Sequence, residues 1–150
     1  MEIDMCNDNY ESIKLCNQMC FPLYVCSKEI VRRYKPYLDE LELTYTQYIA
    51  MMVLWEKKEL TVKELGKELF LDSGTLTPLL KKLESKGYVT RHRMESDERN
   101  LKVTITEKGE ELKENAVKIP DKMSGCVSIS QEEAEQLRVI LQKMLGSFTD

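Results

Sequence analysis

Residues 60–109 read LTVKELGKELFLDSGTLTPLLKKLESKGYVTRHRMESDERNLKVTITEKG, and this stretch decides the fold. Two short helical patterns come first, and two short runs with strand-like alternation then flank a polar loop. Small hydroxyl side chains stand at the start of the second helix, and lysines follow along its length. This order predicts a winged helix-turn-helix, in which one helix enters a DNA major groove and a β-hairpin reaches the backbone or the minor groove.

Capping boxes mark the starts of three helices, because a Ser or Thr is followed three residues later by Glu or Gln. The boxes are Thr44–Gln47, Thr61–Glu64 and Ser130–Glu133, and the helices are expected to run through Trp55, through Leu69 and to about Leu145. Helices are therefore predicted inside the quoted stretch and on both sides of it.

The second helix of the quoted stretch ends near Lys86. Asp72 or Ser73 is placed to cap its start, and Gly87 stands where the residue after a helix is commonly glycine. The elements expected after it are strands at residues 88–93 and 101–106 and a helix from residue 106 to about residue 120.

Apolar residues also recur at helical spacing from Ser12 to Tyr34. Proline is tolerated only near a helix start. Because of Pro22, a regular helix either begins around Cys20 or kinks there. Pro36 then stops the helix or bends it. The last helix has an apolar stripe formed by Ala134, Leu137, Ile140, Leu141 and Leu145. A homodimer would bury these terminal helices, and the alternative is that they cover the monomer's own core.

These patterns predict a mainly α fold with a small β wing. We expect one domain over residues 1–150, with dimerisation helices at about 12–38 and 106–148 and a winged-helix DNA-binding part at about 44–106. No run approaches the roughly 18 apolar residues that span a membrane. The acidic and polar start is unlike a secretory signal. A cytoplasmic protein with no membrane partner is therefore expected.

The net charge of −4 conceals a basic segment between Pro78 and Arg93, which holds five cations against Glu84 alone. Such a face attracts phosphate locally on an acidic protein. The candidate DNA contacts are Ser73, Thr75, Thr77, Lys81, Lys82, Arg91, Asp97 and Arg99. Short hydroxyls at a helix N-terminus can contact phosphate or base edges, and Arg99, oriented by Asp97, is a minor-groove probe.

Other interpretations of these residues are structural. In this interpretation Ser73 serves as an N-cap without touching DNA, and the lysines are simply exposed to solvent. The Asp97-Glu-Arg99 run can be only a polar turn, because hairpin tips favour such residues. Capping and DNA contact are compatible, so Ser73 remains a candidate.

Five cysteines are present, at positions 6, 16, 20, 26 and 126. An odd number without a leader argues against a secreted disulfide scaffold. There is no C-x-x-C pair, and the only histidine, His92, lies far along the chain from four of the cysteines. The sequence therefore predicts no metal site. No cofactor is expected either.

Several motifs together resemble the MarR family of winged-helix regulators, and within it the organic hydroperoxide resistance regulators. They are Asn17-Gln-Met-Cys20-Phe21, Tyr24, Tyr34-Lys-Pro36, Leu43-Thr-Tyr45-Thr-Gln-Tyr48, Val53-Leu-Trp-Glu56, Leu71-Asp-Ser-Gly-Thr-Leu-Thr-Pro78 and Asp97-Glu-Arg99. They run from residue 17 to about residue 110. The Asp-Glu-Arg run alone would indicate only MarR, whereas the motifs at 17–21 and 71–78 together are far more specific.

The resemblance implies a dimeric repressor whose reduced form binds a pseudo-palindromic double-stranded DNA operator. An organic hydroperoxide then oxidises one cysteine, which matches Cys20, and the DNA is released. The tyrosines that bond the thiolate or line its pocket match Tyr34 and Tyr45, with Tyr24 nearby. In the two-cysteine type a second cysteine, which matches Cys126, closes an intersubunit disulfide. The family gives no role to the cysteines at positions 6, 16 and 26.

Peroxide attacks a thiolate, so the site must favour the anion. The helix N-terminus near Cys20 and phenol donors from Tyr34 and Tyr45 would do so. Apolar neighbours such as Phe21 and Trp55 would suit an alkyl or lipid hydroperoxide over hydrogen peroxide. From spacing alone, the cysteines in this helix are more often inert core residues, and tyrosines at helical spacing are usually core residues too.

Three other functions compete with this interpretation. One is a MarR-type repressor that responds to a small phenolic ligand or an electrophile instead of peroxide. Another is a thiol peroxidase, but such an enzyme usually needs a βαβ core around its cysteine, and the chain has no such unit. The last is an architectural DNA-binding protein whose binding no oxidant changes. A regulator without enzyme activity is expected.

Overall fold

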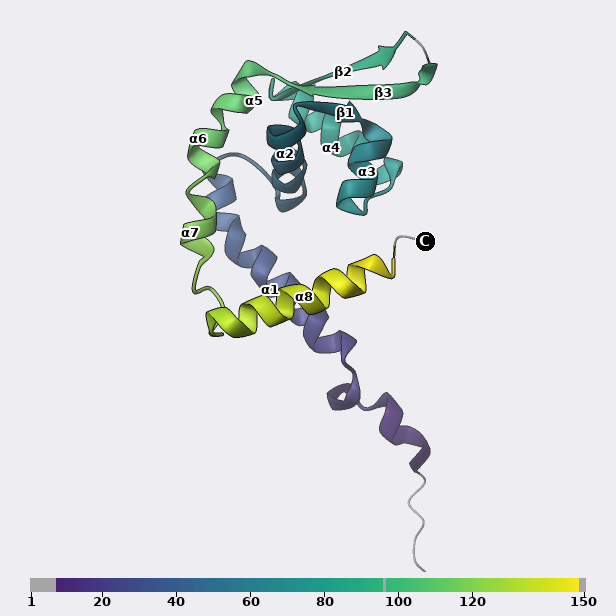
Figure 1. Ribbon diagram of the computed structural model, residues 1–150, viewed down its shortest axis with the longest axis vertical. Helices are drawn as coiled ribbons and strands as arrows, with labels where there is room; N and C mark the ends of the chain where they lie inside the picture. Colours follow the sequence, from purple (N-terminus) through teal and green to yellow (C-terminus); the bar gives the residue numbers. More distant parts are fainter. Residues whose placement is uncertain (1–7, 96, 149–150) are drawn as a thin grey trace, which may run out of the picture. The chain divides into compact units, whose positions relative to one another are not determined.

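The computed structural model describes residues 8–95 and 97–148, except for the side chains of residues 8, 9 and 97–99. The chain divides into two compact units, Met1–Ile119 and Pro120–Asp150. Within the described residues, no helix is both long and apolar enough to cross a bilayer. The first unit contains the winged helix-turn-helix that the sequence predicts (Figure 1).

Three helices form the centre of the first unit: α2 (Tyr45–Lys57), α3 (Val62–Leu69) and α4 (Ser73–Ser85). The capping boxes predicted at Thr44 and Thr61 are both present. Each hydroxyl accepts from the backbone N–H three residues on, and the side-chain oxygen of that Gln or Glu accepts from the backbone N–H of the Thr. Gly87 has φ +80° and follows the end of α4, as expected. Local side-chain chemistry therefore sets these boundaries.

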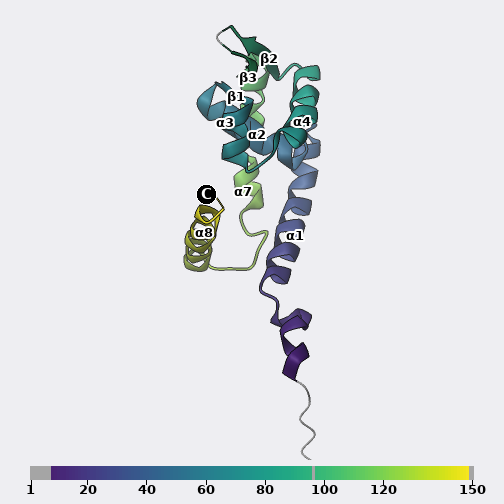
Figure 2. The ribbon, with the colours of Figure 1, turned by 90° about the vertical axis from the view of Figure 1, so that its right-hand side faces the viewer.

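The wing is a three-stranded antiparallel sheet in the order β1-β3-β2, with β1 at Glu59–Thr61, β2 at Val89–Met94 and β3 at Asp97–Ile105. Leu60 and Arg91 both pair with Val103. Figure 2 shows the β2–β3 hairpin projecting beyond the helices of this unit.

Leucines hold the helices and the sheet together. The fully buried side chains include Leu54, Leu65, Leu76, Leu80, Leu83, Val89 and Val103, which come from α2, α3, α4 and the wing. Burial of each such side chain contributes about 1.5–3 kcal/mol. The Trp55 indole Nε1–H donates to the Gly109 carbonyl at 2.8 Å, which ties α2 to the helix after the wing.

Helix α1 covers Cys20–Asp39, after two short 3₁₀ turns, η1 (Asp8–Ile13) and η2 (Leu15–Asn17). Pro22 is its third residue, so its missing N–H falls in the first turn, as the sequence requires. Pro36 lies inside the helix and does not end it.

The prediction of a single helix from residue 106 to about residue 120 is wrong. Thr106 does cap its start, because its hydroxyl accepts from the Gly109 N–H. The helix is then divided into α5 (Glu107–Glu111), α6 (Lys113–Ala116) and α7 (Ile119–Met123). Pro120 has no N–H to bond the Ala116 carbonyl, which explains the second interruption.

Helix α8, at Gln131–Gly146, is the main element of the second unit. Its predicted capping box is present, with the Ser130 hydroxyl accepting from the Glu133 N–H. Large apolar side chains are exposed along it, at Leu137, Val139, Ile140 and Leu145. On α1 the exposed apolar side chains include Phe21, Leu23 and Tyr24.

Candidate DNA interface and cysteine site

Helix α4 has one buried and one exposed face. Leu76, Leu79, Leu80 and Leu83 are buried, whereas Ser73, Thr75, Thr77, Lys81 and Lys82 are all exposed. The apolar spacing of 3–4 residues produces this division. The structure therefore brings the five sequence-predicted α4 candidates to the solvent side of one helix.

Asp72, not Ser73, caps α4. The Asp72 Oδ1 accepts from the Thr75 N–H at 2.8 Å. The Ser73 hydroxyl has no hydrogen-bond partner among the side chains and backbone groups that the structure describes. The carboxylate also brings a negative charge to the helix N-terminus, which counters the phosphate attraction expected there.

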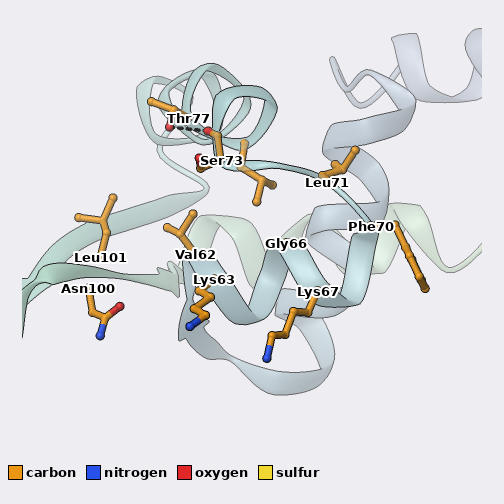
Figure 3. A pocket seen from close by; sticks show the side chains of 11 residues that line it. Val62, Lys63, Gly66, Lys67, Phe70, Leu71, Ser73, Thr77, Asn100 and Leu101 are labelled. Atoms are coloured by element: carbon orange, nitrogen blue, oxygen red, sulfur yellow. Dashed lines mark hydrogen bonds between the residues drawn. The ribbon is translucent and has the colours of Figure 1, made fainter. Parts of the chain in front are cut away.

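A groove of about 650 Å³ lies between α3, the start of α4 and β3. Its lining includes Ser73 and Thr77 from α4, Lys63 and Lys67 from α3, and Asn100 from β3 (Figure 3). Lys63 and Lys67 are exposed and form no ion pair within the described residues. Sequence reasoning missed Lys63, Lys67 and Asn100, because only the packing of three elements brings them together.

Arg91 is half-buried and paired within the chain. Its Nη2 lies 2.7 Å and its Nε 3.0 Å from the Glu84 Oε2, and its backbone N–H donates to the Glu84 Oε1 at 3.0 Å. The hydrogen bond from the Arg91 side chain lowers the pKa of Glu84. Arg91 therefore joins β2 to α4 and is not a free cation for DNA.

The wing differs from the expected hairpin with Asp97-Glu-Arg99 in its loop. The backbone of residues 97–99 belongs to β3, and Asp97 pairs with Met94. The register shifts between Arg93 and Met94, since Arg93 pairs with Leu101. The side chains of Asp97 and Arg99 lie outside the described part, so their predicted DNA contacts stay predictions.

Cys20 is the first residue of α1 and is exposed. The N-cap residue, Met19, makes no capping bond through its side chain, and no acidic residue lies in the first turn. The positive end of the helix dipole is therefore uncompensated beside Cys20. Phe21 follows directly, and Tyr24 lies one turn further on the same side, with Lys28 5.6 Å from its ring centroid.

Tyr34 and Tyr45 belong to an aromatic cluster between α1 and α2. Their ring centroids lie 5.1 Å apart, and Tyr48 lies 6.0 Å from Tyr34 and 6.2 Å from Trp55. Burial raises the pKa of Tyr48, and the nearby Tyr45 adds to the shift. Cys20 lies 14 residues before Tyr34 on the same helix, which is about 21 Å at 1.5 Å per residue. One chain therefore does not bring Cys20 to these tyrosines.

Cys126 is half-buried in the second unit, after Gly125 with φ +80°. Its N–H donates to the Met123 carbonyl, and the turn also contains bonds from Ser124 to the carbonyls of Pro120 and Asp121. Cys16, Cys20, Cys26 and Cys126 are free thiols. In the part of the chain that the structure describes, no three His, Cys, Asp or Glu side chains gather to hold a metal ion.

Comparison with known families and curated proteins gives a consistent result. Residues 32–116 match the family described as "Transcriptional regulator SarA/Rot". The chain is similar to the organic hydroperoxide resistance transcriptional regulator of Bacillus subtilis, with 48% identity over 92% of this chain and 94% of that protein. It is also similar to the regulator SarZ of Staphylococcus aureus, with 49% identity over 85% of this chain and 86% of that one.

A solved protein, AbfR of Staphylococcus epidermidis, has a similar structure. Reduced AbfR bound to DNA is similar with a TM-score of 0.77 and 34% identity, over 95% of this chain and 99% of that chain. The disulfide form of AbfR has a TM-score of 0.63 at the same identity, over 93% and 98% of the two chains.

Proposed function

Because this chain belongs to the SarA/Rot family of MarR-like winged-helix transcriptional regulators, we propose that it is a repressor controlled by a reactive cysteine. Like its relatives it is a regulator and not an enzyme. In the proposed cycle the reduced homodimer binds a pseudo-palindromic double-stranded operator. An organic hydroperoxide oxidises Cys20, and the operator is released. A DNA target is consistent with the cytoplasmic location expected from the sequence.

The DNA-binding half of the proposal rests on the exposed face of α4. Ser73, Thr75 and Thr77 would meet the major groove, and Lys81 and Lys82 would follow the phosphate backbone. Lys63 and Lys67 on α3 would contact the flanking phosphates, as the first helix of a helix-turn-helix crosses the backbone. Arg99 remains the proposed minor-groove contact.

The sensing half rests on the position of Cys20. An exposed thiol at an uncapped helix N-terminus is accessible to peroxide and lies beside backbone N–H groups that have no partner within the helix. The thiolate attacks the distal peroxide oxygen and the O–O bond breaks, so that Cys20 becomes a sulfenic acid and an alkoxide leaves, which takes a proton from water to give the alcohol. Identity of 48% to a hydroperoxide resistance regulator supports this signal.

A complete sensor pocket requires two copies of the chain. Tyr24 accompanies Cys20 on α1, but Tyr34 and Tyr45 of the same chain are about 21 Å away along the helix. A two-fold dimer through the exposed apolar faces of the terminal helices would bring the tyrosines of one copy to the cysteine of the other. Oxidation at this interface would then act directly on the spacing of the two α4 helices.

Two fates of the sulfenic acid are distinguishable. In the first, the thiol of Cys126 on the second copy forms a disulfide with Cys20, and water leaves. In the second, a small thiol takes that role and forms a mixed disulfide. We propose the intersubunit bond, which makes this a two-cysteine regulator. Non-reducing electrophoresis distinguishes the two, because only the first gives a dimer-sized band that reduction removes.

The decisive test compares Cys20→Ser with Cys26→Ser, which replaces another exposed cysteine of the same helix. Each reduced variant is titrated on a duplex that the wild-type protein selects from a random pool, with and without cumene hydroperoxide. We expect Cys20→Ser to bind but not to release, and Cys26→Ser to behave as wild type. Release of DNA by the Cys20→Ser variant would remove Cys20 as the sensor.

The same titration separates the competing signals. Hydrogen peroxide and a phenolic acid such as salicylate each replace cumene hydroperoxide in parallel samples. Release by salicylate from both the wild-type protein and Cys20→Ser would favour a ligand-controlled repressor. Binding that no reagent changes would favour an architectural role.

A further inference from the structure

The first two turns of α4 lack the side chains that most often read bases. Residues 73–85 contain no Arg, Asn or Gln, and the residues that can bond guanine in two-point contacts, Lys81 and Lys82, stand only near the end of the helix. The exposed positions hold hydroxyls at the start, lysines near the end, and Gly74, Thr77 and Pro78 between them. We call Gly74, Thr77 and Pro78 the apolar strip. If this helix distinguishes bases, its middle must do so by a different chemistry.

The hydroxyl of Thr77 is already in use. Its Oγ1 donates to the Ser73 carbonyl at 2.8 Å, within the helix (Figure 3). A hydroxyl has only one proton to donate, so Thr77 cannot also donate to a base without breaking this bond. What the exposed side chain still offers is its methyl group and an acceptor lone pair.

Pro78 stands next to Thr77, inside the helix and exposed. Proline is the least favourable residue in a helix interior, and this one contributes nothing to the buried leucine face. Its ring is an apolar surface in the position where the helix would meet DNA. Gly74, one turn earlier, has no side chain to cover that surface.

We propose that the apolar strip reads the C5-methyl groups of thymines in the major groove. This inference rests on the proposed DNA-binding function and names what that site recognises. The thymine methyl is the only apolar group that any base displays in the major groove. The strip would therefore select thymines at fixed positions in each half-site, between phosphate contacts made by the lysines of α3 and α4.

The experiment removes single methyl groups from the DNA. Reduced full-length protein selects duplexes from a random pool, and each thymine of the selected duplex is replaced in turn by deoxyuridine, which lacks only the methyl. We expect roughly a fourfold rise in Kd for each contacted thymine, which is the loss of about 0.8 kcal/mol per buried carbon at 1.4 kcal/mol per tenfold. Replacement at positions outside the contact should leave Kd unchanged.

Protein variants assign the effect to the strip. Thr77→Ser removes the methyl and keeps the hydroxyl, and Pro78→Ala removes the ring while favouring the helix, so weaker binding cannot be ascribed to unfolding. For each variant, at least one of the deoxyuridine substitutions that raise the Kd of the wild-type protein should leave Kd unchanged. The control is Ser85→Ala at the end of α4, whose hydroxyl also bonds within the helix. It should keep the full deoxyuridine sensitivity.

The possible results separate the proposed DNA-binding function from the recognition of thymine methyl groups. If no duplex is selected, the proposed DNA-binding function fails, and this inference fails with it. A selected duplex that tolerates every deoxyuridine shows DNA binding without methyl recognition, which overturns the inference alone. Deoxyuridine sensitivity that persists unchanged in both strip variants assigns the methyl contact to other residues and also overturns it.

Discussion

Arg91 of β2 and Glu84 of α4 form an ion pair in which two side-chain N–H groups of Arg91 donate to the Glu84 Oε2. The backbone N–H of Arg91 also donates to the Glu84 Oε1. Three hydrogen bonds therefore join the base of the wing to the helix that would enter the major groove. The Arg91 side chain retains 17% of its accessible surface and that of Glu84 retains 36%. The pair is less screened than the exposed i,i+4 pair of Lys35 and Asp39 on α1.

Glu84→Gln should lower the free energy of unfolding by about 1 kcal/mol, because it removes a charge-assisted two-point contact at a partly exposed site. Asp39→Asn, which removes one partner of the exposed pair, should change it by less than about 0.5 kcal/mol. Urea denaturation of both variants at pH 7 measures the difference. Equal effects would mean that the pair contributes no more than a surface contact.

The same pair predicts a pH dependence. The pKa of Glu84 is lower in the folded protein than its ordinary value of 4.5, so folding favours the ionised carboxylate. The contribution is complete above that ordinary value and is lost as the pH falls through the lowered folded value. The unfolding free energy of Glu84→Gln should therefore fall less steeply than that of wild type below about pH 4.5. Parallel curves would contradict the assigned cause.

Asp72 and Ser73 should separate stability from DNA binding. Asp72→Ala removes the N-cap of α4 and should cost about 1 kcal/mol of stability. Ser73→Ala should leave stability nearly unchanged and weaken binding to the selected duplex. Thermal denaturation and a DNA titration on each variant measure the two quantities. Loss of stability in Ser73→Ala would show that Ser73 also caps α4, as the sequence allowed, and would contradict the assignment of the cap to Asp72 alone.

Gly109 is confined by neighbouring atoms. A Cβ at this position would lie 2.3 Å from the Tyr88 carbonyl oxygen and 2.8 Å from the Ile105 Cγ1. Gly109→Ala should therefore destabilise the protein by about 1–3 kcal/mol through overpacking. Gly146→Ala is the control, because a Cβ added there would meet nothing within 4 Å apart from its chain neighbours and the backbone of its own helix. It should be neutral or slightly stabilising, and a similar loss there would exclude overpacking as the cause.

Lys63 and Lys67 should contribute to the salt dependence of DNA binding. Their replacement by Gln should raise Kd and reduce the slope of log Kd against log salt by about 0.9 for each phosphate that is no longer neutralised. In a symmetric dimer each substitution affects two such phosphates. Lys35→Gln, on α1, should leave the slope unchanged. An unchanged slope in the double variant would take α3 out of the DNA interface.

Cys126→Ser should separate sensing from disulfide formation. The variant should still release DNA at first, because Cys20 still forms the sulfenic acid. It should give no dimer-sized band under non-reducing conditions and should overoxidise more readily, which mass spectrometry of the Cys20 peptide measures. A crosslink that survives in this variant, with peptides joining Cys20 to Cys16 or Cys26, would contradict the proposed partner.

The candidate site could be predicted only in part. The five α4 candidates were chosen for their hydroxyls at the helix start and their lysines, and burial of Leu76, Leu79, Leu80 and Leu83 leaves all five exposed. Their contact with DNA stays a prediction. Helical periodicity could not find Lys63, Lys67 or Asn100, because their common groove is formed by elements that the sequence separates. Arg91 was predicted to be available for DNA, and only the packing of β2 on α4 brought Glu84 within its reach.

The sequence by itself determined the features that involve neighbours three or four residues apart. The capping boxes and the positive φ of Gly87 follow from local hydrogen bonding. The missing N–H of Pro22 left either a start of α1 around Cys20 or a kink there, and the structure shows the start. The separation of Cys20 from Tyr34 follows from their spacing along the single helix α1. The tertiary structure, by contrast, decided which residues far apart in sequence meet: Arg91 with Glu84, Trp55 with Gly109, Tyr34 with Tyr45. Such contacts depend on how whole helices pack, and packing is the sum of many small contacts that no local pattern encodes.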